Sequence, residues 1–411
     1  MGARVKRRVD NKGRVLPPGI SYRSDGRYQA RYTLNGRRYV IYDTNLQQIK
    51  KKLIDAQYQI QNNMHNYNNS MILNDWFKKW LEVYKKKKIK EVTYNNYVQY
   101  WNWYVANALG LSMLKDIKRA QIVEFYNGLL YSTNPIGTGT LKIINNLIKS
   151  ALDQAVYNDL LLKNPAENIL KEVATPPEKE RRALTKKEQE IFFGYVKQDV
   201  FFKKYLPLFT VIFGTGARIG EITALTWNDI DFENEVIRID KTLHYLRKVN
   251  EDGHHYLITT PKTVKSIREI PMLIEVKEAL LKQRQNQNLL GTKSEIVING
   301  YSDFVFTTSR CKPYTPDGVN LEIKRVINSY NEHEKLNAVL HEREPELLEL
   351  FSPHIIRHTF ASRCFEEGLQ PKTTQSILGH ANLRTTMDVY THCNQEALKK
   401  EMDLLNKLAI S

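Results

Sequence analysis

The chain has 411 residues, more than one ordinary hydrophobic core accommodates, so two or three domains are expected. Its hydrophobic fraction of 42% and charged fraction of 26% are typical of folded proteins and exclude wholesale disorder. The 61 Lys+Arg against 45 Asp+Glu give a net charge of +16, which predicts a polyanionic partner such as nucleic acid or an anionic membrane surface.

Several classes of protein are disfavoured by what the sequence lacks. No apolar run approaches the roughly 20 residues that span a bilayer, and the most apolar segment, 205–216, predicts a core helix. The basic N-terminus has no apolar stretch behind it, which argues against a secretory signal. The three cysteines form no CxxC pair, and we find no P-loop and no carboxylate cluster with metal-ligand spacing. We therefore expect a cytoplasmic protein that uses no cofactor and no metal.

The first 70 residues predict a small basic domain. They hold 14 Lys+Arg and 4 Asp+Glu, so +10 of the total charge lies in this part of the chain. Alternation over 26–44, a turn at Asp25-Gly26 and a hairpin signal at Asn35-Gly36 predict three short strands. Thr44 is the expected N-cap of a helix over 46–61, which would cover the apolar face of the sheet.

The middle strand of this predicted sheet has two different faces. Side chains alternate along a strand, so Arg27, Gln29 and Arg31 share one face. Tyr28, Ala30 and Tyr32 share the other. One face is therefore expected to pack against the helix, and the other to contact a polar partner.

The rest of the chain predicts two further domains. Residues 71–172 contain long helical patterns at 72–84, 93–108 and 141–158, with a lysine-rich run at 85–90 between two of them. A linker is expected at 173–183, and Thr185 with Glu188 then predicts a capping box. Residues 184–397 mix helices with the strands of a small antiparallel sheet, predicted at 236–240, 256–260 and 266–271. Residues 398–411 form a helical tail with an apolar stripe at Leu398, Met402, Leu405 and Leu408.

Arg218 stands in the segment Thr215-Gly-Ala-Arg-Ile-Gly-Glu221, where glycines bracket an arginine. Such a turn can project the side chain from a tight backbone, and a guanidinium group has the planar fork that suits phosphate oxygens. Glu221 lies three residues further on, on the same helix face. The segment indicates either a phosphate ligand or a surface arginine paired with Glu221.

His354 and Arg357 belong to the segment Ser352-Pro-His-Ile-Ile-Arg-His358. Ser352 predicts an N-cap and Pro353 the first helical residue, so His354 falls in the first turn, where backbone N–H groups and the helix dipole favour an anion. Arg357 is three residues away and is expected to face the same way. The alternative is a capped helix with a buried histidine, and we assign His358 to structure.

Two further candidates are weaker in isolation. The segment Leu378-Gly-His380 predicts a helix that ends at a glycine, and Tyr390 lies 10 residues beyond the histidine in the second turn of the next predicted helix. Any one of the 23 tyrosines is more often a packing residue. Lys262 lies in Thr260-Pro-Lys, at an expected hairpin tip that could bring it to a bound ligand, although most such lysines are merely solvated.

Taken together, the order of these segments closely resembles the catalytic set of the tyrosine recombinases, or phage-type integrases. The resemblance covers essentially the whole chain, and the stretches Gly-Tyr-Ser-Asp-Phe-Val-Phe at 300–306 and Thr-Pro-Lys at 260–262 are most similar to integrases of conjugative transposons. It implies a multidomain α+β protein with a small three-stranded-sheet N-terminal domain (1–70) that binds arm sites, as in the phage lambda integrase. An all-helical core-binding domain (71–172) and a mixed α/β tyrosine recombinase catalytic domain (184–397) would follow.

The resemblance also implies a role for each candidate residue. Arg218 and Arg357 would bind the non-bridging phosphate oxygens, with Glu221 steadying Arg218. Lys262 would protonate the leaving 5′ oxygen, His354 would assist proton transfer, and His380 would add a hydrogen bond to the phosphate. Tyr390 would be the nucleophile and form a covalent 3′-phosphotyrosyl link.

The expected partner is double-stranded DNA that carries attachment sites. Contacts are predicted from Arg27, Gln29, Arg31, Arg37 and Arg38 of the N-terminal domain, and from Lys86 and Lys87 of the lysine run. By resemblance, the protein would be a monomer off DNA and a homotetramer on it, with an excisionase and a host DNA-bending protein as further partners. The tail at 398–411 would dock on a neighbouring subunit, or pack on its own domain.

Two rival functions share much of this pattern. A DNA-binding regulator with the same fold would bind without cutting, but it would have no physical need for the complete catalytic set. An enzyme resembling the type IB topoisomerases would share the tyrosine chemistry and only relax supercoils. Relaxation does not require a separate basic domain that reads sequence, so a recombinase is favoured.

Overall fold

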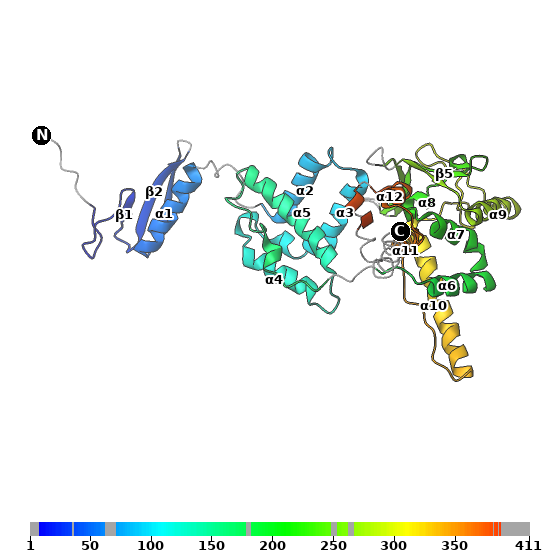
Figure 1. Ribbon diagram of the computed structural model, residues 1–411. Helices are drawn as coiled ribbons and strands as arrows, with labels where there is room; N and C mark the ends of the chain where they lie inside the picture. The colour runs from blue at the N-terminus through cyan, green and yellow to red at the C-terminus, as the bar shows by residue number, and fades with distance from the viewer. Residues whose placement is uncertain are drawn as a thin grey trace, which may run out of the picture. The chain divides into compact units, whose positions relative to one another are not determined.

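The computed structural model describes residues 8–34, 37–61, 71–177, 182–247, 253–261, 267–380, 382–384 and 386–387. The chain divides into two compact units, Met1–Glu178 and Lys179–Ser411, which are described separately. The first unit contains the N-terminal sheet domain and the helical domain. The second, called here the C-terminal unit, mixes helices and strands (Figure 1).

The N-terminal domain is a three-stranded antiparallel sheet with one helix against it, which confirms the predicted fold (Figure 1). The strands run in the order β1 (Ile20–Tyr22), β2 (Tyr28–Leu34) and β3 (Arg37–Asp43), and α1 (Leu46–Gln61) follows. Tyr28 and Ala30 of β2 and Ile49 of α1 are almost fully buried between helix and sheet. Alternation therefore placed the apolar face correctly.

The cap of α1 differs from the prediction by one residue. Asn45, not Thr44, accepts hydrogen bonds through its Oδ1 from the backbone N–H groups of Gln47 (2.8 Å) and Gln48 (3.3 Å). An asparagine directly before the first helical residue reaches the unpaired N–H groups of the first turn, whereas Thr44 lies one residue too early.

The helical domain is held together by aromatic packing. Its elements are α2 (Leu73–Trp80) continued by η2 (Leu81–Lys85), α3 (Glu91–Tyr100) continued by η3 (Trp101–Val105), η4 (Leu109–Leu111), η5 (Leu114–Asp116), α4 (Arg119–Leu130), α5 (Thr138–Tyr157) and η6 (Ile169–Lys171). Phe77 stacks on Trp101 with ring centroids 3.7 Å apart. The buried Trp76 donates its indole N–H to the carbonyl oxygen of Ala151 at 2.7 Å, which ties α2 to α5.

The first residues of the predicted linker pack on this helical domain. The hydroxyl group of Tyr131 donates to the carbonyl oxygen of Ala174 (2.6 Å), and that of Thr138 donates to the carbonyl oxygen of Pro176 (2.8 Å). Val173 is 5% exposed and belongs to the domain core. The segment 173–176 is therefore anchored, and the exact linker boundaries stay a prediction.

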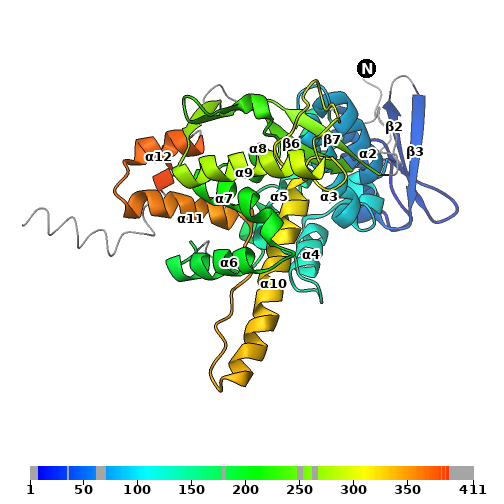
Figure 2. The ribbon, with the colours of Figure 1, turned by 90° about the vertical axis from the view of Figure 1, so that its right-hand side faces the viewer.

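The C-terminal unit surrounds a large apolar core with helices (Figure 2). Its helices are α6 (Lys186–Gln198), η7 (Lys203–Tyr205), α7 (Leu206–Thr215), α8 (Ile219–Ile222), η8 (Trp227–Asp229), α9 (Ile274–Leu290), α10 (Pro316–Leu340), α11 (Pro353–Glu366) and α12 (Pro371–Leu378). The capping box of α6 is present, since Thr185 Oγ1 accepts from Glu188 N–H at 3.1 Å and Glu188 Oε2 accepts from Thr185 N–H at 2.8 Å. The apolar segment α7 is a buried core helix, as predicted.

The strands of this unit form two sheets rather than the single sheet predicted. One has the order β4 (Ile230–Asp231), β5 (Val236–Ile239) and β8 (Arg268–Pro271), and the other is a hairpin of β6 (Thr242–Arg247) and β7 (His254–Thr259). Strand β7 pairs with β6 and β8 pairs with β5, so β7 and β8 are not partners of each other. The predicted hairpin tip with Lys262 lies outside the described residues. Alternation identifies a strand but not its partner, and the prediction had no β6.

Two absences hold for the residues that the structure describes. None of those helices is long and apolar enough to cross a membrane. The same residues include no group of three or more His, Cys, Asp or Glu side chains that could hold a metal ion.

Candidate functional site

Arg218 is positioned by a sharp turn between α7 and α8. The turn begins at Gly216, whose φ of 58° lies in the left-handed region. A Cβ atom at this position would lie 2.5 Å from Cδ1 of Phe360, so glycine is required both for the backbone conformation and for the packing of α11. Arg218 then occupies the N-cap of α8, and its side chain is 40% exposed. The predicted role of the glycine as a tight-turn residue is confirmed.

Glu221 fixes the orientation of Arg218 from a buried position. One carboxylate oxygen accepts from the backbone N–H of Arg218 and the other from its Nη1, both at 2.9 Å, while Glu221 is only 4% exposed. Burial acts to raise the pKa of this carboxyl group, but Arg268 and Arg218 outweigh it and hold the pKa of Glu221 below its usual range. Glu221 is therefore an ionised structural anion.

Arg357 of α11 contacts both the turn that carries Arg218 and the end of α12. Its Nη1 donates to the carbonyl oxygen of Gly216 at 3.0 Å and its Nη2 to that of Leu378 at 2.7 Å. The residue is 6% exposed. Burial, followed by the nearby charge of Arg218, lowers the pKa of Arg357 to about 9, so it keeps its positive charge near pH 7.

His380 follows directly on the C-terminal glycine cap of α12. Gly379 has φ 65° and ends the helix as predicted, and Gln375 Nε2 donates to the carbonyl oxygen of His380 at 3.0 Å. The His380 Nδ1 atom lies 2.9 Å from Oγ1 of Thr386. Burial and then the charges of Arg357 and Arg218 lower the pKa of His380 to about 4. The imidazole is therefore neutral at ordinary pH.

Arg268 is a member of this cluster that the sequence analysis missed. It is the first residue of β8, its side chain is 6% exposed, and its Nη2 donates to Glu221 Oε2 at 2.8 Å. Its position, two residues after the start of the predicted strand 266–271, carried no functional signal. Only the pairing of β8 with β5 brings it under α12.

His354 and Arg357 occupy different environments. His354 is in the first turn of α11, as predicted, and is exposed, whereas Arg357 is buried against the turn that carries Arg218. A spacing of three residues is compatible with a common face, and the structure leaves His354 exposed while it buries Arg357. Lys262 and Tyr390 lie outside the described residues, so their roles stay predictions.

The predicted DNA-contacting residues of the N-terminal domain lie mostly on the sheet face opposite α1. Arg27 is exposed and its guanidinium carbon lies 5.4 Å from the ring centre of Tyr42 on β3. Arg31 and Arg38 are also exposed. Gln29 is an exception, because it is 5% exposed and its Oε1 accepts from Arg31 Nη2 at 3.4 Å. Position 37 lies in β3, and its side chain is outside the described residues.

Lys86 and Lys87 are exposed in the turn after η2. Lys86 pairs with Glu82 (Nζ to Oε2, 2.8 Å) and lies 5.7 Å from the ring centre of Tyr94. The hydroxyl group of Tyr94 donates to the same Glu82 at 2.6 Å, and burial together with this carboxylate raises the pKa of Tyr94 to about 12. A phosphate would have to compete with Glu82 for Lys86, whereas Lys87 shows no such pair.

The lowered pKa of His380 predicts a pH-dependent stability. The group has a pKa of about 4 when folded and an ordinary value of 6.5, so between these values the unfolded chain binds a proton that the folded chain does not. The stabilisation is complete above pH 6.5 and is lost as the pH falls toward 4. From pH 7 to pH 4 we expect the free energy of unfolding of His380→Asn to fall by about 1 to 2 kcal/mol less than that of the wild type, after allowance for solvent screening.

Urea unfolding of both proteins across this range measures the difference. His341→Asn, at an exposed position just after α10, is the control and should keep the wild-type slope. Equal slopes for His380→Asn and the wild type would contradict the buried, neutral imidazole.

Comparison with protein families gives matches along most of the chain. Residues 182–397 match the Phage integrase family, residues 72–130 match the phage integrase N-terminal SAM-like domain, and residues 4–59 match the DNA-binding domain of the Tn916 integrase. The three matches follow the order of the sheet domain, the helical domain and the C-terminal unit.

Individual relatives cover almost the full length. The transposase from transposon Tn1545 of Streptococcus pneumoniae is 28% identical, over 98% of this chain and 97% of the relative. The transposase from transposon Tn916 of Enterococcus faecalis is 27% identical over the same shares. Among solved structures, the Tn1549 transposon integrase in complex with a circular intermediate DNA has a TM-score of 0.69 and 26% identity, over 82% of this chain and 100% of that one. A lambda integrase tetramer bound to a Holliday junction has a TM-score of 0.53 at 18% identity, over 92% and 95%, and supports the fold alone.

Proposed function

Since the chain belongs to the phage integrase family and is a tyrosine-type site-specific recombinase, we propose that it integrates and excises a mobile DNA element through a covalent 3′-phosphotyrosyl intermediate and a Holliday junction. One observation carries the proposal. Three candidate residues from distant parts of the sequence, Arg218, Arg357 and His380, meet at the end of α12. Its relatives are transposases of mobile elements, and the similar Tn1549 integrase has been solved on transposon-end DNA.

The first task of such a site is to stabilise charge on a phosphodiester. A phosphate that is attacked by a phenolate gains negative charge in the transition state, and fixed donors stabilise that charge where it develops. Arg218, held by Glu221 yet 40% exposed, can present its guanidinium group to a non-bridging oxygen. Arg357 is the more buried of the two and contributes a fixed positive charge beneath the site.

We assign the nucleophile to Tyr390. Its phenolic oxygen would form a bond to phosphorus while the bond from phosphorus to the 5′ oxygen breaks, leaving the DNA 3′ end attached to the protein. The phenolic proton passes to a base, for which His354 is the candidate, and Lys262 donates a proton to the departing 5′ oxygen. Attack by the 5′ hydroxyl of another strand reverses these steps, and because the phosphotyrosyl bond preserves the energy of the phosphodiester, no ATP is consumed.

His380 serves best in this scheme as a neutral hydrogen-bond donor. With a pKa of about 4 its imidazole is in the neutral form near pH 7 rather than the imidazolium form, so it is unsuited to act as the general acid. The Nδ1 atom lies 2.9 Å from Oγ1 of Thr386, so Nε2 is the nitrogen that would donate to the phosphate. This assignment makes the imidazole a ligand of the phosphate and leaves proton transfer to other groups.

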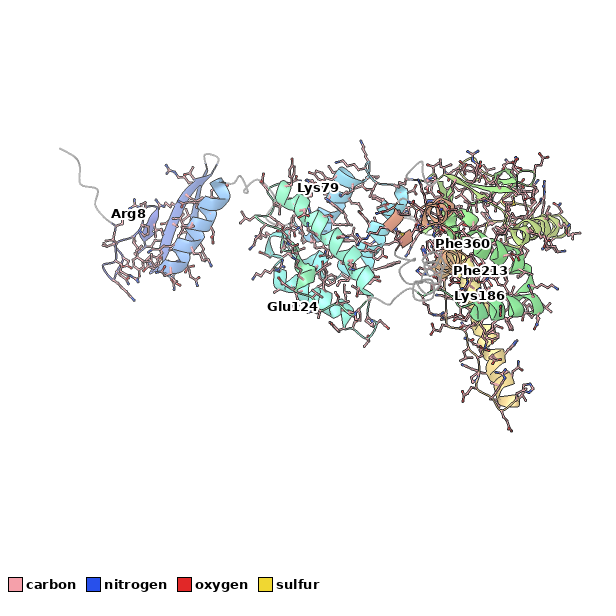
Figure 3. The ribbon with its side chains drawn as sticks, in the orientation of Figure 1. Arg8, Lys79, Glu124, Lys186, Phe213 and Phe360 are labelled. Atoms are coloured by element: carbon pink, nitrogen blue, oxygen red, sulfur yellow. The ribbon has the colours of Figure 1, made fainter. Side chains whose placement is uncertain are left out.

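We extend the proposal to an assembly of four copies on two duplexes. A related fold has been solved as a tetramer on a Holliday junction. The C-terminal unit also has a cavity of about 890 Å³ between α6, α7, α9 and α11, which is separate from the arginine cluster. Lys186, Phe213 and Phe360 are among the residues that line it, and Figure 3 labels these three side chains. The apolar stripe of the tail 398–411 from a neighbouring copy is the proposed occupant.

We also propose a cellular location and two partner proteins. The relatives named above come from bacteria, whose DNA lies in the cytoplasm, so we place its action there. An excisionase and a host DNA-bending protein are proposed as partners that would choose between integration and excision. Both would act by bending DNA between sites bound by the N-terminal and helical domains.

The central experiment is capture of the covalent intermediate. The full chain is incubated with nicked duplexes that carry candidate element ends, so that the released fragment diffuses away and rejoining is prevented. We expect a protein–DNA complex that survives denaturant. Binding without any such complex would favour a non-cutting regulator, and relaxation of supercoiled plasmid lacking element ends would favour a topoisomerase.

The face of the N-terminal sheet opposite α1 should contribute to the affinity for DNA, and this contribution should depend on salt. Removing one phosphate contact lowers the slope of log affinity against log salt by about 1. We therefore expect Arg27→Ala and Arg31→Ala each to weaken binding to arm-site DNA and to reduce this slope. Lys51→Ala is the matched control, because Lys51 is exposed on α1, which covers the other face of the sheet. Unchanged slopes for both arginine variants, measured by fluorescence anisotropy, would show that the DNA lies elsewhere.

A further inference from the structure

The carbonyl oxygens at the end of α12 are held by three arginines that come from three different elements. The carbonyl of Ile377 accepts from Arg268 Nε at 2.6 Å. The next, Leu378, accepts from Arg357 Nη2 at 2.7 Å, and Gly379 accepts from Arg218 Nη2 at 3.4 Å. Helix C-termini carry unpaired carbonyls and a partial negative charge, so three cations here satisfy both needs. His380 is the residue that follows.

Arg268 is the member of this set that also forms a buried ion pair with Glu221. Its Nη2 lies 2.8 Å from Oε2 of Glu221 and its Nη1 lies 3.3 Å from Oε1, which makes the ion pair bidentate. The Arg268 side chain is 6% exposed and the Glu221 side chain is 4% exposed. Each Glu221 oxygen therefore accepts one bond from Arg268 and one from Arg218. A Cβ atom at position 379 would lie 2.9 Å from Arg268 Nη1, so the guanidinium group packs directly on Gly379.

We infer that Arg268 is a positioning residue for DNA cleavage, which sets the placement of both Arg218 and His380 by bridging Glu221 to the end of α12. Arg268 has no need to touch DNA, because Arg218 is the more exposed of the two. Without it, Glu221 would draw Arg218 toward itself, and α12 would lose the donor at Ile377. The inference rests on the proposed cleavage reaction.

The charge of the cluster supports this role. Among the residues that the structure describes, Glu221 is the carboxylate that pairs with Arg218 and Arg268, and Arg357 lies in the same cluster, so three guanidinium groups and one carboxylate leave two positive charges in excess. A phosphodiester attacked by a phenolate carries two negative charges in the transition state. Arg268 thus offsets Glu221, so that the charge of Arg218 remains available to the phosphate.

The position of Arg268 also joins the site to the segment that carries Lys262. Arg268 begins β8, six residues after the lysine, and β8 is fixed to β5 by the pairing of Arg268 with Ile239. The contact of Arg268 with Ile377 then fixes the start of β8 against α12. Arg268 therefore fixes the start of β8, which is the C-terminal attachment point of the segment that carries Lys262.

Cleavage by Arg268→Gln and Arg268→Lys tests the inference. We expect Arg268→Gln to bind nicked substrate with wild-type affinity and to form the covalent adduct about 100-fold more slowly at saturating protein, since a small misplacement of catalytic groups has an effect of this size. Arg268→Lys keeps the charge but cannot hold Glu221 and Ile377 together, so an intermediate rate is expected. Arg238→Gln on β5, whose side chain is 60% exposed, is the matched control and should cleave normally.

The pH profile separates positioning from a general loss of structure. His380 is faced by Arg218 and Glu221 of the α8 turn, by Arg357 of α11 and by Arg268 of β8, with the hydroxyl group of Thr386 beside it. Protonation of His380 would place a further positive charge against Arg218 and Arg357 and would displace the imidazole from its position. Loss of the Arg268 charge should raise the pKa of His380, so the resulting acid-side decline of the cleavage rate should begin at a higher pH in Arg268→Gln than in the wild type. Glu221→Gln in the Arg268→Gln background restores the charge excess, and the amide oxygen of the glutamine can still accept a hydrogen bond from Arg218, so part of the rate should be recovered.

Two results would overturn the inference. One is a wild-type rate for Arg268→Gln at every pH, and the other is an equal reduction at every pH without recovery in the double variant. If circular dichroism shows that Arg268→Gln does not fold, Arg268→Lys alone serves as the test. A wild-type cleavage rate and a wild-type pH profile of cleavage in Arg268→Lys would then overturn the inference. Failure of the wild-type protein to form an adduct would instead count against the proposed function.

Discussion

Tyr390→Phe is expected to form no covalent protein–DNA complex on nicked substrates. The phenolic oxygen is the atom that would bond to phosphorus, and phenylalanine keeps the ring while removing only that atom. Because no other group in the proposed mechanism can take its place, the loss should be complete rather than partial. Affinity for the same DNA should remain within about twofold, since one hydroxyl contributes little to an interface dominated by phosphate contacts.

Denaturing gels of the protein after incubation with labelled DNA measure this result directly. Tyr157→Phe is the control, because Tyr157 is 84% exposed at the end of α5 in the helical domain and should tolerate the change. Adduct formation by Tyr390→Phe at the wild-type rate would show that another residue is the nucleophile. Loss of adduct in both variants would point to a general sensitivity of the protein rather than to chemistry.

Arg218→Gln is expected to slow cleavage by about 100- to 1,000-fold, which corresponds to about 3 to 4 kcal/mol of transition-state stabilisation. Glutamine can still donate a hydrogen bond to Glu221 but carries no charge to the phosphate. Glu221 would then keep Arg268 as its remaining cationic partner. We expect the fold to persist, because Arg218 is 40% exposed and its removal opens no cavity in the core.

Single-turnover cleavage at saturating protein is the appropriate measurement, since it isolates the chemical step from DNA binding. Arg325→Gln is a close control. Arg325 also pairs with a glutamate three residues away, Glu322 at 3.0 Å, but it is 61% exposed on α10, away from the cluster. A reduction for Arg218→Gln no greater than that for Arg325→Gln would remove Arg218 from the phosphate site.

The order of the domains was predictable because each has its own periodicity. Alternation at 26–44 with a turn at Asn35-Gly36 specifies strands, and apolar spacings of three and four specify the helices that follow. The ends of helices were equally predictable, as at Gly379, where a residue in the left-handed conformation ends α12. The error of one residue at the α1 cap shows the limit of this reasoning, because Thr44 and Asn45 are both good caps and only the geometry of the first turn distinguishes them.

Strand partners and burial could not be obtained in this way. The predicted strand at 266–271 was real, but its neighbour is β5 rather than β7. Gln29 lies on the expected face of β2 and yet is buried beside Arg31. In each case long-range contacts between chain segments decided the outcome, and alternation carries no information about them.

The amino-acid order was enough to predict candidate phosphate-binding residues and roughly where helices and strands begin. Arg218, Arg357 and His380 were identified because turns, caps and helix ends are local features governed by neighbouring residues. Packing across the fold brings Arg268 to these residues, buries Glu221 between two arginines and lowers the pKa of His380. The physical reason is that burial and charge depend on groups brought together across the fold, so a pKa or a shared hydrogen bond exists only after β8, α8, α11 and α12 have packed.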